Sequence, residues 1–143
     1  MKAFLEWRDE WSLGIELIDK QHRQLVVIFN KIAVLSIVKD DQIDSAQRLT
    51  QLYEQLDIFY EKIKEHFSDE EDLMLKVNYP GHAEHARNHL MLRVELKQQI
   101  KHIEEEKGNV DMETLASLKI WFISHIISDD KEFADFFLSN IGA

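Results

Sequence analysis

Histidine and glutamate residues stand in this chain where an amphipathic helix should carry leucine or isoleucine. Reading back from His66 in steps of three and four residues gives a series of apolar residues, and reading forward gives Glu70 and then Leu73. Residues four apart lie on the same side of a helix, so His66 and Glu70 share the apolar face. Burying a carboxylate beside an imidazole is costly unless a positive group holds both, and a metal ion is the simplest such group.

The same pattern recurs in three other helical segments, which contribute His22, the pair His85 and His89, and His125. A single histidine on an apolar face is usually an ordinary core residue. Five histidines on the apolar faces of four segments, with a carboxylate beside them, predict a shared metal site instead. His82 and His102 lie outside these faces, and we expect no metal role for them.

Hydrophobic periodicity divides the chain into a short arm and four helices, followed by a last amphipathic segment that reaches Leu138. We expect the arm over residues 1–17 and helices over about 18–38, 43–76, 80–107 and 111–129. Four helices with short connections predict an all-α, up-down-up-down four-helix bundle, with the arm packed across it. No linker or repeat interrupts the pattern, so we expect a single domain over residues 1–143.

Turn-forming residues separate the expected helices. Asp19 is expected near the N-cap of the first helix, and Lys39-Asp40-Asp41 in the turn that follows that helix. Pro80 suits the first turn of the third helix, because its missing N–H would be unpaired there in any case. Gly108-Asn109 is typical of the end of that helix.

Composition excludes several classes of function. The formal net charge of −10 disfavours nucleic acid and anionic membranes as partners. The absence of cysteine excludes disulfides and zinc–thiolate sites. Charged residues interrupt the N-terminal stretch too early for a signal peptide, and the most apolar run, Leu25 to Val38, is too short to span a bilayer. We therefore expect a soluble, cytoplasmic protein without membrane insertion.

The predicted donor set narrows the choice of metal. Zinc is usually four-coordinate in proteins, and five imidazoles with one or two carboxylates are too many for one zinc ion. Ala86 also stands where a zinc protease motif would need glutamate after its first histidine. Calcium and magnesium prefer oxygen ligands. A pair of iron ions fits best, with manganese and copper as alternatives.

Four motifs, in order along nearly the whole chain, together resemble the bacterial hemerythrins. They are Gly14-Ile15…Ile18-Asp19-x-Gln21-His22-x-x-Leu25, His66-Phe67-x-x-Glu70-Glu71, Tyr79-Pro80-x-x-x-x-His85-x-x-x-His89 and His125-Ile126-x-x-Asp129-Asp130-Lys131. The resemblance implies a four-helix bundle that holds a non-haem di-iron centre and binds O₂ reversibly.

The resemblance also implies which residues bind the two irons. By position, one iron would take His85, His89 and His125, and the other would take His22 and His66. Glu70 and Asp130 would bridge the irons, together with an oxo or hydroxo group. Counting donors leaves one coordination position open on the iron with two histidines, and O₂ would bind there.

Spacing and resemblance disagree on the carboxylate that follows His125. Asp129, four residues on, shares its helical face, whereas a regular helix would rotate Asp130 about 140° away. The resemblance favours Asp130. We predict that Asp130 is the bridge and that the helix contains a wide, π-type turn somewhere in 125–130, with Asp129 facing outward or capping nearby backbone. The alternative is that the helix ends earlier and Asp130 reaches the metal from a loop.

Seven apolar residues lie within about two helical turns of the expected ligands. They are Leu25, Phe29, Phe59, Ile63, Trp121, Phe122 and Ile126. They are expected in the core, and we also expect them to form a dry O₂ pocket that keeps water and protons from the bound ligand.

The leading hypothesis for function is O₂ carriage, storage or delivery, without enzymatic turnover. The alternatives are an O₂ or redox sensing module and a di-iron enzyme with peroxidase, ferroxidase or nitric-oxide activity. The first helix also has apolar residues beyond its core face, at Val26, Val27, Val34 and Val38. They indicate either a protein partner or self-association, unless the arm with Trp7 and Trp11 covers them.

Overall fold

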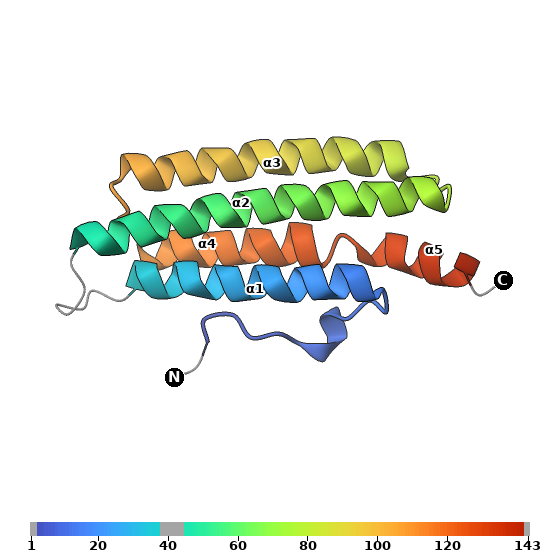
Figure 1. Ribbon diagram of the computed structural model, residues 1–143, viewed down its shortest axis with the longest axis horizontal. Helices are drawn as coiled ribbons and strands as arrows, with labels where there is room; N and C mark the ends of the chain where they lie inside the picture. The colour runs from blue at the N-terminus through green and yellow to red at the C-terminus, as the bar shows by residue number, and fades with distance from the viewer. Residues whose placement is uncertain (1–2, 38–44, 142–143) are drawn as a thin grey trace.

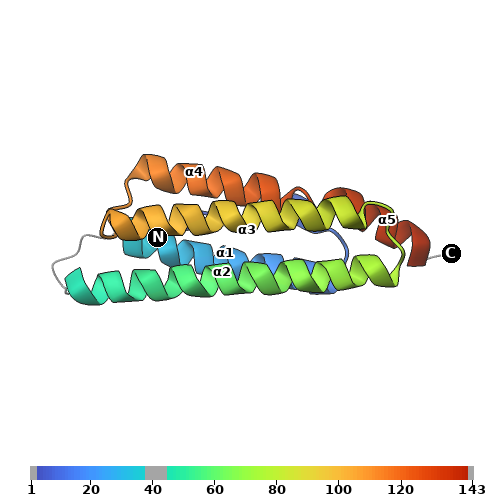
Figure 2. The same ribbon diagram turned by 90° about the horizontal axis from the view of Figure 1, so that it is seen from above.

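The computed structural model describes residues 3–37 and 45–141, and within these ranges the regular structure is entirely helical. The elements in chain order are a 3₁₀ turn η1 (Asp9–Trp11), α1 (Glu16–Ile37), α2 (Ser45–Lys76), α3 (His82–Glu105), α4 (Met112–Phe122), a π-helix η2 (Ile123–Ile127) and α5 (Lys131–Ile141). The long helices run side by side as a four-helix bundle, and α5 continues α4 toward the C-terminus (Figures 1 and 2). The predicted all-α bundle is confirmed.

Local sequence explains the ends of α3 and α4. Lys107 and Gly108 take the left-handed conformation, with φ of 57° and 75°, and the Gly108 N–H donates to the Ile103 carbonyl at 2.9 Å. This arrangement closes the end of α3. Asp111 caps α4, since its carboxylate accepts from the Thr114 N–H at 2.7 Å. The turn at Gly108 lies where the sequence predicted it, and α4 begins one residue after the expected start at 111.

Two expectations about helix starts are wrong. Pro80 lies in the turn before α3, where the His82 N–H donates to the Tyr79 carbonyl at 3.2 Å, and not in the first turn of the helix. Asp19 is inside α1, which begins at Glu16, and is not its N-cap. The expected turn at Lys39-Asp40-Asp41 lies outside the described residues.

Asp19 instead fastens the end of the arm. Its buried carboxylate accepts hydrogen bonds from the backbone N–H groups of Leu13 at 2.8 Å and Gly14 at 3.1 Å. Gly14 has a φ of 85°, a conformation that favours glycine, which lets the chain turn from the arm into α1.

A second polar side chain of α1 holds the start of the arm. The Asn30 side chain accepts from the Leu5 N–H at 2.8 Å and donates to the Leu5 carbonyl at 2.8 Å. Leu5 itself is buried, and Lys119 of α4 donates to the Phe4 carbonyl at 3.1 Å. The arm therefore connects α1 with α4, as Figure 1 shows along the side of α1.

The core consists of two apolar clusters, a large one along most of the bundle and a smaller one beside α5. Three segments contribute residues to both clusters. In each segment a polar residue lies between the residues of one cluster and those of the other. His22 lies between Ile18 and Leu25, Glu70 between Phe67 and Met74, and Asp130 between Ile127 and Phe133. The predicted site is thus a polar layer between two dry clusters.

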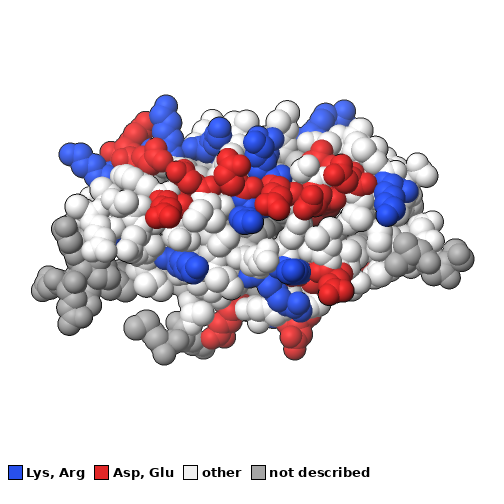
Figure 3. Space-filling view, viewed as in Figure 1, with Lys and Arg blue, Asp and Glu red and all other residues white. Residues whose placement is uncertain are grey.

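Charged residues are mixed on the face shown in Figure 3, where they gather mainly over α2 and α3. On α1, Val26 is buried, whereas Val27 and Val34 remain about half exposed. The arm therefore does not cover the whole apolar side of α1, and Val38 lies outside the described residues. Among the helices described, none is long and apolar enough to cross a membrane.

Removing the Asn30 side chain should loosen the arm. We expect Asn30→Ala to lower the free energy of unfolding by about 1–3 kcal/mol, because the Leu5 N–H and carbonyl both lose their partner. Urea denaturation followed by circular dichroism would measure the change. Lys31→Ala, at the neighbouring exposed position, should change it by less than about 0.5 kcal/mol. Equal losses in the two variants would contradict this role of Asn30.

Candidate metal centre

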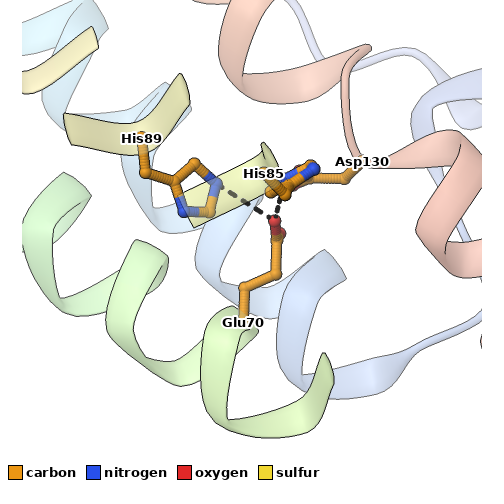
Figure 4. A group of neighbouring side chains, drawn as sticks. All are labelled: Glu70, His85, His89 and Asp130. Atoms are coloured by element: carbon orange, nitrogen blue, oxygen red, sulfur yellow. Dashed lines mark ion pairs between the residues drawn. The ribbon is translucent and has the colours of Figure 1, made fainter. Parts of the chain in front are cut away.

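Six of the seven predicted ligands converge in the polar layer between the two apolar clusters. His22 comes from α1, His66 and Glu70 from α2, His85 and His89 from α3, and Asp130 from the turn between η2 and α5. Figure 4 shows Glu70, His85, His89 and Asp130 facing one another from three segments. All but His85 are fully buried, and the side chain of His85 is 15% exposed.

The first group of donors is formed by His22, His66 and Asp130. The His22 and His66 Nε2 atoms lie 2.9 and 3.2 Å from Asp130 Oδ2, and 3.2 Å from each other. Both rings therefore aim the same nitrogen at one carboxylate oxygen.

The second group is formed by His85, His89 and Glu70. The His85 and His89 Nε2 atoms lie 2.7 and 3.3 Å from Glu70 Oε1. This group meets the first at both carboxylates, since Glu70 Oε2 lies 3.4 Å from His66 Nε2 and Asp130 Oδ1 lies 3.5 Å from His85 Nε2. Each carboxylate thus directs one oxygen toward each pair of imidazoles.

These separations suit metal coordination. Metal–nitrogen and metal–oxygen bonds of about 2.1 Å at right angles place neighbouring donor atoms about 3 Å apart. Within the described part of the chain, neither oxygen of buried Glu70 has a hydrogen-bond partner in good geometry. A buried carboxylate without such a partner is costly, and a cation held between these donors would offset the cost.

The carboxylates have opposite pKa shifts. Burial, together with the charge of Asp130, raises the pKa of Glu70 well above its usual range. Burial also acts to raise the pKa of Asp130, but hydrogen bonds with the surrounding imidazoles, first of all with His22, outweigh it and hold that pKa well below its usual range. Asp130 therefore favours its ionised form and Glu70 its protonated form. A cation bound in the site would favour ionisation of Glu70 as well.

The pKa values of the imidazoles are also shifted in opposite directions. Burial acts to lower the pKa of His85, but its bonds to Asp130 and Glu70 outweigh burial and raise this pKa to about 10. Burial lowers the pKa of His66, and it lowers that of His89 to about 3. His66 and His89 therefore favour the neutral form that metal ligands need, whereas His85 has to lose its proton when it binds a metal.

His125 is not part of this group. Its side chain is 49% exposed, and its Nδ1 atom lies 3.7 Å from Oδ2 of Asp129, which is equally exposed. His125 nevertheless lines the same cavity as His85 and His89, with a volume of about 250 Å³. This cavity lies directly beside the second group of donors.

The backbone around Asp130 explains why spacing and resemblance disagreed. The Ser128 N–H donates to the Ile123 carbonyl at 3.0 Å, five residues back, within the π-helix Ile123–Ile127. A wide turn is therefore present, as predicted, although it begins before residue 125. Asp130 itself lies in the non-helical turn that follows, so the alternative that the helix ends before Asp130 is also correct, and Asp129 faces outward as expected.

The seven residues of the predicted O₂ pocket are all buried in the large apolar cluster. Phe29 stacks on Phe122 with ring centroids 5.7 Å apart, and Phe59 meets Phe122 edge-on at 5.4 Å. Trp121 is anchored through its Nε1–H, which donates to Glu95 at 3.0 Å.

Two residues without an assigned role in the sequence analysis contact the ligands. Gln21 Oε1 lies 2.7 Å from His66 Nδ1, and Glu71 Oε2 lies 3.1 Å from His89 Nδ1. Their signal in the sequence is that both belong to the motifs that carry the resemblance, where Gln21 precedes His22 and Glu71 follows Glu70. Helical periodicity does not reveal such contacts, since they join residues of different helices.

Comparisons with known proteins identify a family over most of the chain. Residues 13–137 match the family model described as the hemerythrin HHE cation binding domain. A bacteriohemerythrin of Stenotrophomonas maltophilia is 30% identical over 139 residues, which cover 93% of this chain and 81% of that protein. A bacteriohemerythrin of Clostridium acetobutylicum is 30% identical over 132 residues, which cover 90% of this chain and 98% of that protein.

A solved structure supports the same fold. The crystal structure of a hemerythrin mutant superposes on this chain with a TM-score of 0.77 and 21% identity, covering 95% of this chain and 98% of the other. Because the family model spans most of the chain, the chain belongs to the hemerythrin HHE cation-binding domain family.

Proposed function

We propose that this protein binds O₂ reversibly at a non-haem di-iron centre, for oxygen carriage, storage or delivery. The observation that carries the proposal is the division of the Glu70 and Asp130 carboxylates, each of which directs one oxygen to each group of imidazoles. Two metal ions bridged by two carboxylates require this arrangement. A donor set rich in imidazole, with carboxylates, is well suited to iron.

His22 and His66 would hold one iron, and His85 and His89 would hold the other. We propose that His125 completes the second set by turning from the cavity wall toward His85 and His89. Bound ferrous ions would supply the electrons and the open coordination position that reversible O₂ binding needs. The chain's own residues would orient the imidazoles and hold protons away from the site.

The two apolar clusters support reversible binding over turnover. Leu25 and Ile63 lie one helical turn from His22 and His66, and both are fully buried. Such surroundings exclude the water and proton donors that would release or cleave a reduced oxygen ligand. We further propose that the protein works in the cytoplasm, with O₂ as its principal partner.

The purified protein should contain two irons per chain. Metal analysis would count them, and the optical spectrum should change reversibly when O₂ is removed and readmitted. Removal of iron should also lower the melting temperature, because the buried ligands lose their cation. One zinc per chain without iron would contradict the di-iron assignment. Steady consumption of O₂ with a stoichiometric reductant would favour an enzyme instead.

Substitution of the adjacent aspartates tests the bridge. Asp130→Asn should weaken iron retention by at least about tenfold, since even residues outside the coordination sphere commonly contribute that much. Asp129→Asn is the matched control, because Asp129 carries the same charge but is half exposed. Iron released to a chelator would be measured for both. A larger loss in Asp129→Asn would reverse the assignment.

His125 can be tested in the same way. If His125 joins the second iron, His125→Gln should lose that iron more readily than the wild type and show a weaker O₂-dependent spectrum. His102→Gln provides the control, since His102 is an exposed histidine of α3. Full iron content and an unchanged O₂ spectrum in His125→Gln would show that His125 stays at the cavity wall.

A further inference from the structure

We propose that Asp69 and Gln21 form a positioning relay that holds His66 in the tautomer required for metal binding. The inference rests on the proposed function, because it concerns a ligand of the proposed centre. Asp69 does not contact the metal donors directly. It acts through Gln21, which belongs to a different helix.

The relay consists of two short hydrogen bonds between α1 and α2. The Gln21 side-chain nitrogen Nε2 donates to Asp69 Oδ2 at 2.7 Å. The other end of the same amide, Gln21 Oε1, lies 2.7 Å from Nδ1 of His66. Asp69, Gln21 and His66 are all at least partly buried.

Hydrogen-bond chemistry fixes the direction of the relay. An ionised carboxylate can only accept, so the nitrogen end of the Gln21 amide must face Asp69. The oxygen end then faces His66, and an amide oxygen can only accept as well. Nδ1 of His66 must therefore carry the ring proton. In a neutral imidazole this leaves Nε2 without a proton, and its lone pair points at the donor group formed with His22 and Asp130.

Without this constraint His66 could carry its proton on Nε2, where the proton would bond to the Asp130 carboxylate at 3.2 Å and occupy the metal position. The Nδ1 atoms of His89 and His22 have different surroundings. His89 donates directly to the carboxylate of Glu71 at 3.1 Å, and His22 Nδ1 has no hydrogen-bond partner within the described structure. Of these three imidazoles, and within the described residues, His66 alone has a neighbour that a second side chain holds in place, since Asp69 binds the Gln21 amide.

Asp69→Asn is the sharpest test, because it keeps the size of the side chain. Asparagine can both donate and accept, so the Gln21 amide would no longer be held in one orientation. Nitrogen-15 NMR of the metal-free protein should place the proton on Nδ1 of His66 in the wild type and show a mixture of tautomers in the variant. Zinc affinity, measured by competition with a chromogenic chelator, should fall by about 10–100-fold.

Asp57→Asn is the matched control. It removes the same charge from an exposed position on the same helix, far from the site in sequence, and should change neither the tautomer nor zinc affinity. Should Asp69→Asn fail to fold by circular dichroism, Gln21→Met, which removes the acceptor without changing charge, is expected to show the same loss of the Nδ1–H tautomer.

The outcomes separate the relay from the proposed function. A wild-type His66 protonated at Nε2, or an unchanged tautomer in both Asp69→Asn and Gln21→Met, would overturn the relay. The NMR measurement needs neither iron nor O₂. A shifted tautomer in a protein that binds no O₂ would therefore uphold the relay while rejecting the proposed function.

Discussion

The structure depends on two carboxylates buried between imidazoles in an otherwise apolar interior. Glu70 and Asp130 are almost completely inaccessible to water, and isolated charges in such a place are strongly unfavourable. They are tolerated because imidazoles from α1, α2 and α3 surround them and because a cation can satisfy their oxygens. The same polar layer separates the two apolar clusters. The helices are therefore aligned along the bundle so that the donors lie at the same level.

The break in the last helix follows from this requirement. A regular helix from Met112 onward would turn Asp130 away from the centre. The π-helix at Ile123–Ile127 and the turn after it bring the carboxylate within 2.9 Å of His22. Such π segments often occur at functional sites. In the same segment, His125 and Asp129 face outward together.

Polar residues of α1 have structural tasks that their helical positions conceal. Asp19 and Asn30 bind the backbone of the arm, and Gln21 bridges His66 and Asp69. The arm and the metal site are therefore held by the same helix.

Sequence patterns alone were sufficient for the all-α bundle and for the gathering of His22, His66, Glu70, His85 and His89, because helical periodicity shows which face is buried. Motif resemblance added Asp130, against the spacing. Tertiary structure decided what periodicity cannot express: the helical position of Asp19, the start of α3 after Pro80, the outward side chain of His125 and the contacts of Gln21 and Glu71. These features depend on local shifts in backbone hydrogen bonding and on side chains that meet across helices, and neither leaves a periodic trace in the chain.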